Sequence, residues 1–232
     1  MANACADGRV VVFSASPRKG GNSNFAAVLL AEKMSQLARK PCVVLQAWEH
    51  SILGCTGCGT CRKKIAAWNK KEIIAQGQIE GFRAFSENFL TTCPLYGTDT
   101  SAPLLQAMIQ ASLLVFVSPI YQYNIPSGAR AVLERLQPFF EFSRSAEAGL
   151  PGRETPEIRW CQPVFIAGRK RGEKLFEGSR LSLKYALAPL GYRMMPALTF
   201  RGLDEADALR NSPASQSALL RQANALAKKM AL

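Results

Sequence analysis

The sequence predicts one α/β domain built around a doubly wound parallel sheet. The chain has 232 residues, of which 48% are hydrophobic and 20% charged, as expected for a soluble globular protein with a sizeable core. Five short apolar runs, rich in branched or large side chains, occur along it, and helical patterns lie between them. Strands that alternate with helices in this way form parallel sheets with helices on both faces.

The five apolar runs are the predicted strands. Each is short and apolar at successive positions, which is typical of strands whose two faces are both buried in a parallel sheet. They span residues 9–14, 42–46, 113–118, 160–167 and 192–200. Five strands fit the flavodoxin-like order 2-1-3-4-5.

Helices are predicted between these strands and after the last one. Residues 22–39 begin with Asn and Ser, which are good helix N-caps, and then repeat apolar residues at helical spacing. The other predicted helices span residues 101–111, 128–136, 174–190 and 215–230.

Two irregular stretches interrupt this pattern. Residues 62–92 are interpreted as an insertion, and residues 143–157 as a polar connection that contains Gly and Pro. The sequence shows no repeats, no low-complexity tract and no second domain, so residues 1–232 are expected to form one flavodoxin-like domain.

The charge and the N-terminus limit the function classes. Twenty-nine Lys and Arg against 17 Asp and Glu give a net charge of +12, but the cations are spread along the chain. An anionic cofactor or an acidic partner is therefore expected rather than nucleic acid. No stretch is long and apolar enough to span a membrane, and residues 1–14 lack the features of a signal peptide. We expect a cytoplasmic protein whose seven cysteines stay reduced, which favours metal or redox chemistry over disulfides.

The loop after the first strand, "SASPRKGGNSN" (14–24), is a candidate anion site. It carries hydroxyls, amides, a guanidinium and two glycines, and it leads into a helix N-terminus, where free N–H groups favour an anion. In this fold the ligand lies at the carboxyl ends of the strands, where the strand order reverses. The loop has neither the Walker nor the Rossmann glycine pattern, which leaves the phosphate of a mononucleotide. The alternative is an ordinary polar loop.

Three motifs resemble those of a known family. "SPRKGGNSN" (16–24) is similar to the phosphate loop of the NAD(P)H-dependent FMN reductases with a flavodoxin-like fold. "SPIYQYNIPSGARAVLERL" (118–136) resembles their second signature, which passes the flavin ring and opens the next helix. "ILGCTGCGTC" (52–61) stands where the iron–sulfur flavoprotein and multimeric-flavodoxin branch has a compact cysteine motif.

The resemblance implies positions for the FMN-binding residues. The FMN phosphate would be held by Ser16, Arg18, Asn22, Ser23 and Asn24. The isoalloxazine ring would lie against Pro119, Ile120, Tyr121 and Asn124, and a third loop would contribute Gly168 and Gly172. This third loop departs from the family because Arg169, Lys170 and Arg171 stand where small residues are more usual.

The three cysteines of "GCTGCGTCRKK" (54–64) raise a separate question. Their C-x2-C-x2-C spacing is typical of [4Fe–4S] proteins, which need a fourth thiolate that often precedes a proline. Cys93 precedes a proline, so the predicted cluster has the ligands Cys55, Cys58, Cys61 and Cys93, with residues 62–92 looping out between them. The alternatives are a zinc site, a redox dithiol and cysteines that hold no cluster.

The resemblance also implies an activity. NAD(P)H would be oxidised through FMN, and the electrons would pass to a small acceptor such as a quinone, or singly through the cluster. No side chain is expected to be an acid or base, because the cofactor carries the chemistry. A homodimer or homotetramer is implied as well. The alternative is an electron-transfer iron–sulfur flavoprotein that docks an acidic redox protein and has no small-molecule substrate.

Overall fold

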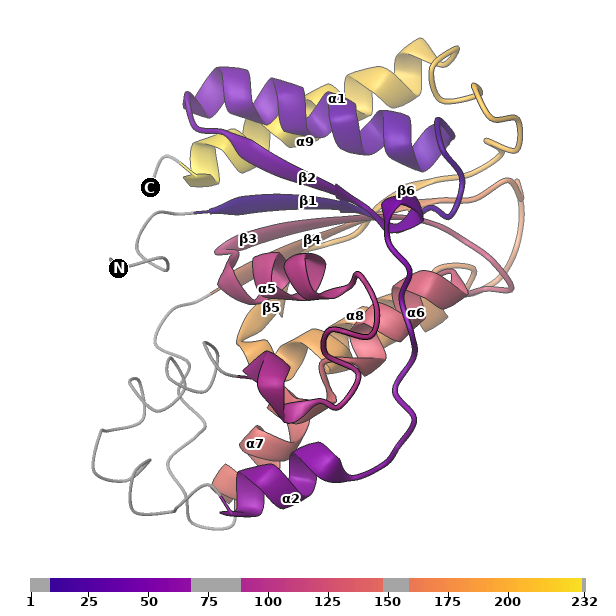
Figure 1. The fold of residues 1–232 in the computed structure, drawn as a ribbon. Helices are drawn as coiled ribbons and strands as arrows, with labels where there is room; N and C mark the ends of the chain where they lie inside the picture. Colours follow the sequence, from indigo (N-terminus) through magenta and orange to yellow (C-terminus); the bar gives the residue numbers. More distant parts are fainter. Residues whose placement is uncertain (1–8, 68–88, 148–158, 231–232) are drawn as a thin grey trace.

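The computed structural model describes residues 9–67, 89–147 and 159–230, which form a central sheet with helices on both faces (Figure 1). The sheet order is β2-β1-β3-β4-β5, and every pair in it is parallel, which confirms the predicted topology. The strands on this path are β1 (Val10–Ser14), β2 (Cys42–Gln46), β3 (Leu113–Pro119), β4 (Arg159–Ile166) and β5 (Tyr192–Met194).

The predicted strand at 192–200 is two short strands. β5 pairs with the first part of β4, and β6 (Leu198–Phe200) pairs with the last part of the same strand. Pro196 lies between them and cannot donate a ladder hydrogen bond, which explains the break. The Gln162 side chain donates to the Pro196 carbonyl at 2.9 Å, so the gap is bridged by a side chain instead.

Alternate residues of the strands face two separate cores. The core on one face packs the sheet against α1 (Asn22–Ala38) and α9 (Pro213–Met230). The other core packs it against α5 (Ala102–Gln110), α6 (Ser127–Glu134), α7 (Gln137–Glu147) and α8 (Glu177–Leu187). In β1, Val10 and Val12 enter the first core while Val11 and Phe13 enter the second, as the two-residue period of a strand requires.

The two stretches predicted to be irregular contain helix where they are described. α2 (Thr60–Ala67) occupies the start of the predicted insertion, and a 3₁₀ turn, η2 (Phe89–Thr92), occupies its end. Residues 68–88 and 148–158 lie outside the described residues. α7 extends into the predicted connection as far as Glu147, because its apolar positions pack against the second core. No helix in the described ranges is long and apolar enough to cross a membrane.

Candidate functional site

A cavity of about 450 Å³ lies at the carboxyl ends of β1, β3 and β4, and we call it the strand-end cavity. Parallel strands end at the same edge of a sheet, so the loops that follow them meet there. The cavity is bordered by residues of four loops and of the helix and strand ends beside them, namely Ser16, Arg18, Gly21, Asn22, Ser23, Pro119, Ile120, Tyr121, Gln122, Ile166, Gly168, Leu203, Asp204 and Ala206.

The first loop presents an uncapped helix N-terminus to this cavity. α1 begins after Gly21 and has neither a side-chain cap nor an acidic residue in its first turn. Its first N–H groups therefore lack an anionic partner from the chain itself. A Cβ built on Gly20 or Gly21 would meet no atom within 4 Å, so there is open space in front of the helix. Ser16, Arg18 and Ser23 border that space, which suits a phosphate.

The polar atoms of the Asn22 side chain bond to backbone groups of the protein. Its Nδ2 donates to the carbonyls of Leu203 at 3.1 Å and Glu205 at 2.7 Å, and its Oδ1 accepts from the Leu209 N–H at 2.9 Å. The amide of Asn22 thus holds the loop after β6 against the start of α1. Asn22 still borders the cavity, but its side-chain donors and acceptor already have partners.

Asn24 does not border the cavity. It is 5% exposed, and its amide lies 2.9 Å from the Ser14 hydroxyl and 2.6 Å from the Gln46 amide. These contacts join the ends of β1 and β2. The Asn24 side chain therefore fixes the first loop to the ends of these two strands.

The second loop is a tight turn in a rare backbone conformation. Tyr121 and Asn124 exchange two backbone hydrogen bonds, at 2.8 and 2.9 Å, around Gln122 and Tyr123, whose φ angles are +48° and +62°. Positive φ at two successive residues that are not glycine is costly, and such strain gathers at functional sites. The Asn124 Oδ1 accepts from the Ile125 N–H at 2.9 Å and from the Ser182 hydroxyl at 3.2 Å, so Asn124 braces the turn and does not border the cavity.

Tyr121 connects the first two loops. The Arg18 Nε donates to the Tyr121 hydroxyl at 3.1 Å, and the guanidinium carbon lies 5.8 Å from the centre of the ring. Pro119, Ile120 and Tyr121 line the cavity together with the start of α1. The arrangement places an apolar wall beside an anion site.

The third and fourth loops approach each other closely. A Cβ on Gly168 would lie 2.2 Å from the Asp204 Oδ1, so only glycine allows this approach without a shift of Asp204. Gly168 borders the cavity, whereas Gly172 does not and instead accepts two hydrogen bonds from Arg201 at 3.2 Å.

The sequence reasoning missed the loop after β6, which supplies Leu203, Asp204 and Ala206 to the cavity. The signal was available, because the polar stretch "RGLDEADALRN" (201–211) follows the last predicted strand at the same edge of the sheet. The predicted site residues therefore fall into two groups. The structure brings together Ser16, Arg18, Asn22, Ser23, Pro119, Ile120, Tyr121 and Gly168, and it places Asn24, Asn124 and Gly172 outside the lining.

All four predicted metal ligands border a second cavity, of about 410 Å³, which we call the cysteine cavity. Cys55, Cys58, Cys61 and Cys93 lie along its wall, together with Arg62, Arg135 and Glu141. Cys93 thus lies beside the other three cysteines, although 31 residues separate it from Cys61.

The four thiols do not form a metal site as they stand. No group of three or more His, Cys, Asp or Glu side chains among the described residues is arranged to hold a metal ion. Cys61 lies in the first turn of α2, whereas Cys55 and Cys58 precede that helix, and their sulfur atoms contact the Gly57 N–H at 3.4 Å and the Thr60 hydroxyl at 3.3 Å. The predicted [4Fe–4S] cluster therefore has no ligand set in this structure, and that prediction is not supported.

The thiols have different environments. Hydrogen bonding to Thr60 lowers the pKa of Cys58, which is exposed. Burial raises the pKa of Cys61, and the neighbouring Glu141, Cys55 and Cys93 raise it further. Cys58 therefore has more nucleophilic thiolate character than Cys61.

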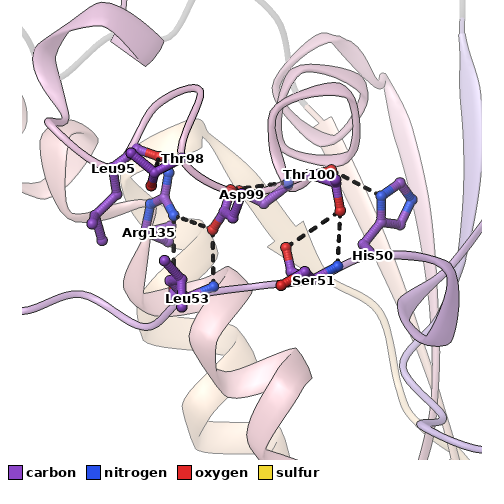
Figure 2. A network of polar contacts seen from close by, with 9 residues as sticks. His50, Ser51, Leu53, Leu95, Thr98, Asp99, Thr100 and Arg135 are labelled. Carbon is purple, nitrogen blue, oxygen red and sulfur yellow. Dashed lines mark hydrogen bonds and ion pairs between the residues drawn. The ribbon is translucent and has the colours of Figure 1, made fainter.

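A polar network holds the two cysteine-bearing segments together (Figure 2). The Asp99 carboxylate accepts from the Leu53 N–H at 2.9 Å and pairs with the Arg135 Nη1 at 2.7 Å. The Ser51 N–H donates to the Thr100 hydroxyl at 2.8 Å, and His50 Nδ1 lies 2.9 Å from the Thr100 carbonyl oxygen. These contacts join the segment that leads to Cys55 to the segment that follows Cys93.

The fold is shared with several reductases of known structure. The azoreductase from Bacillus anthracis str. Sterne superposes with a TM-score of 0.58 at 14% identity, covering 95% of this chain and 99% of that one. An FMN-dependent NADH-azoreductase from Bacillus anthracis str. Ames Ancestor, solved in complex with FMN, gives 0.53 at 13% identity, covering 97% and 100%. The NAD(P)H:quinone oxidoreductase from Methanothermobacter marburgensis gives 0.53 at 12% identity, covering 95% and 98%.

Comparison of the sequences gives a more specific result. No curated protein matches the chain in sequence. The model of the family described as NADPH-dependent FMN reductase matches residues 9–148, which are 140 of the 232 residues. This span contains the first two loops of the strand-end cavity, with the uncapped start of α1 and the Tyr121 turn. The chain therefore belongs to the NADPH-dependent FMN reductase family and is an FMN-dependent oxidoreductase.

Proposed function

We propose that the strand-end cavity binds FMN and that the chain oxidises a nicotinamide nucleotide there and reduces a small electron acceptor. The observation that carries this proposal is the uncapped N-terminus of α1, which faces the cavity together with Ser16, Arg18 and Ser23. An anionic ligand at this place would complete the helix terminus with charge-assisted hydrogen bonds.

The cavity fits the two ends of FMN in different ways. Ser16, Arg18 and Ser23 would hold the phosphate in front of α1, beside the open space at Gly20 and Gly21. Pro119, Ile120 and Tyr121 would border the flavin ring with apolar surface, and Gly168 would let Asp204 pack closely against the backbone at the border of the cavity. Asn22, Asn24 and Asn124 would act indirectly, because each holds a loop of the cavity through its own hydrogen bonds.

The chemistry of this reaction belongs to the cofactor. FMN, when bound, supplies the centre that accepts a hydride from the nicotinamide and gives up the electrons to the acceptor. The protein binds and orients the reactants. The strained Tyr121–Asn124 turn positions the apolar wall, and the loop held by Asn22 closes the side formed by Leu203 and Asp204. No acid or base side chain is needed for these tasks.

The acceptor is proposed to be a small compound that takes two electrons at once. The structural neighbours include an azoreductase and a quinone oxidoreductase, which supports an azo compound or a quinone. An iron–sulfur centre has no place in the proposal, because the four thiols at the cysteine cavity are not arranged as metal ligands in the described part of the chain. Iron and acid-labile sulfide in anaerobically purified protein would contradict this part.

We also propose that the chain forms a homodimer or a homotetramer. A groove of about 570 Å³ runs between α6, α7 and α8, and it is bordered by the apolar side chains of Phe140 and Tyr185. These residues are 49% and 66% exposed in the single chain, and with the groove they form an apolar surface that a second copy could cover. Sedimentation of the protein at several concentrations tests the assembly.

Anaerobic reduction tests the proposed activity. Protein loaded with FMN should lose the absorbance of oxidised flavin when NADH or NADPH is added, and a quinone or an azo dye should restore it. The variant Lys229→Gln should be reduced and reoxidised like the native protein, because Lys229 rests on Trp160 at the other end of β4, far from the cavity. A protein that binds neither FMN nor riboflavin, or that stays oxidised with both nucleotides, would refute the proposal.

A further inference from the structure

Four exposed cations lie on two loops that border the strand-end cavity, and we call them the basic lip. They are Arg169, Lys170 and Arg171, which follow β4, and Arg201, which follows β6. The two loops that carry them, residues 167–174 and 201–205, contain five cations and three acidic residues, which leaves a charge of +2. None of the four cations forms an ion pair within the described ranges.

Backbone hydrogen bonds place the basic lip at the edge of the cavity. The Gly202 N–H donates to the Arg169 carbonyl at 3.2 Å, and the Leu203 N–H donates to the Ala167 carbonyl at 3.1 Å. Gly168 and Leu203, which border the cavity, therefore lie within two residues of Arg169 and Arg201 of the lip. A Cβ on Gly202 would lie 3.1 Å from the Lys170 side chain, so this side chain packs closely against the backbone of the other loop.

Two of the guanidinium groups are already oriented by aromatic rings. The Arg169 guanidinium carbon lies 5.6 Å from the centre of the Tyr123 ring, and its Nη1 donates to the Tyr123 hydroxyl at 3.4 Å. The Arg201 guanidinium carbon lies 4.8 Å from the centre of the Phe176 ring, and both of its Nη atoms donate to the Gly172 carbonyl. Cations held in this way lose little freedom when an anion binds.

The combination of cations and rings selects a class of ligand. Flat guanidinium and aromatic groups offer stacking surface, and the unpaired positive charges attract an anion. We propose that the electron acceptor of this reductase is a planar aromatic anion, such as a sulfonated quinone, whose anionic group binds the basic lip while its ring lies at the mouth of the FMN-loaded strand-end cavity. This inference rests on the proposed function.

The reaction balances with components that the proposed function supplies. The nicotinamide nucleotide gives up a hydride, which carries two electrons and one proton, and solvent supplies the second proton. The two carbonyl oxygens of the quinone each take a proton, so the quinone becomes the hydroquinone and the nucleotide is oxidised. The anionic substituent takes no part in bond making and serves only for binding.

Two matched acceptors test the inference. The experiment measures kcat/KM of FMN-loaded protein for naphthoquinone sulfonate and for unsubstituted naphthoquinone, with the same nucleotide at the same concentration. The ratio of the two values cancels any effect on the nucleotide step. The double variant Arg169→Gln/Arg201→Gln should lower the ratio about three- to ten-fold at low salt, because two exposed charge contacts are lost. Lys229→Gln removes a cation stacked on Trp160 at the amino end of β4, away from the cavity, and should leave the ratio unchanged.

A binding measurement gives a second readout that does not depend on turnover. Calorimetric titration of the oxidised FMN-loaded protein with naphthalene sulfonate should show weaker binding in the double variant by a similar factor, and the difference should shrink at high salt. An unchanged ratio together with unchanged sulfonate affinity overturns the inference while leaving the proposed function intact.

Other outcomes separate the two proposals further. If neither quinone is reduced, the proposed function fails, and the titration alone decides whether the lip binds aromatic anions. If the ratio is unchanged but reduction of an acidic redox protein such as a flavodoxin slows in the double variant, the lip is a protein-docking surface, and the inference is overturned in favour of that partner.

Discussion

The ion pair between Asp99 and Arg135 provides a sharp test of what holds the cysteine cavity together. The two side chains are 1% and 2% exposed, and the Arg135 Nε is buried without a hydrogen-bond partner. Asp99→Asn keeps the shape of the side chain but leaves the guanidinium without its counter-ion. Removing one partner of a buried pair costs about 3–5 kcal/mol, because the other charge stays buried and uncompensated. For a chain of this length, this corresponds to a fall of roughly 6–20 °C in Tm.

Urea unfolding, followed by circular dichroism, measures this cost. The matched control is Glu134→Gln, since Glu134 precedes Arg135 and pairs with Arg130 at 3.6 Å, with side chains 46% and 51% exposed. An exposed pair of this kind is worth at most about 0.5 kcal/mol. Adding Arg135→Met to Asp99→Asn should recover part of the loss, because it removes the unpaired charge. Equal unfolding midpoints for Asp99→Asn and Glu134→Gln would refute the reasoning.

The same pair predicts a pH dependence. Burial alone would raise the pKa of Asp99, but hydrogen bonds from Ser101 and Leu53 and the charge of Arg135 outweigh it, so its pKa is lowered. A carboxyl group with a depressed folded-state pKa stabilises the fold above its unfolded pKa of about 3.9 and loses that contribution as the pH falls through the folded value. The stability difference between the native protein and Asp99→Asn should therefore be constant near neutrality and shrink below about pH 4.

Three further predictions follow from single residues. Arg18→Ala should weaken FMN about ten- to a hundred-fold and riboflavin much less, because riboflavin lacks the phosphate; equal losses in fluorescence titrations would remove Arg18 from the phosphate site. Gly178→Ala should lower FMN affinity, since its Cβ would lie 2.8 Å from the Tyr123 carbonyl, whereas Gly128→Ala, in helix α6 with open space, should stabilise the protein by about 0.5–1 kcal/mol in urea unfolding. Cys58 should react faster than Cys61 with a disulfide reagent at a given pH, and Cys161, whose pKa is raised by complete burial, should react only on unfolding.

The topology was predictable because the strands are short, apolar on both faces and separated by helical patterns. A strand that is buried on both faces needs apolar residues at successive positions, so its sequence shows its environment directly. The break between β5 and β6 was missed, although Pro196 marked it, because the apolar residues on both sides suggested one continuous strand. α2 was missed because its sequence is polar apart from a few positions, and only Ile65 within it is buried.

The candidate site was predictable in its location but less so in its detail. Ligands of parallel sheets bind at the carboxyl ends of the strands, and this located the loops that carry Ser16 and Tyr121. Residue type could not show where an amide points. Asn22, Asn24 and Asn124 all resemble ligand-binding residues in the sequence, yet each bonds to neighbouring parts of the protein. The approach of Cys93 to the other cysteines was predicted from the proline that follows it and from the family resemblance, whereas the orientation of the thiols depends on where α2 begins, which the sequence did not reveal.

The link from Asn22 to the loop after β6 has a consequence for biosynthesis. The strand-end cavity uses residues from both ends of the chain, since Asn22 bonds to the backbone of Leu203, Glu205 and Leu209. A ribosome delivers these partners nearly two hundred residues apart, and β1 cannot take its central place until β3 has emerged. The pocket is therefore complete only after almost the whole polypeptide has been synthesised. A nascent chain arrested before Leu203 would lack one wall of the pocket, so cofactor loading must be a late event in the life of each molecule.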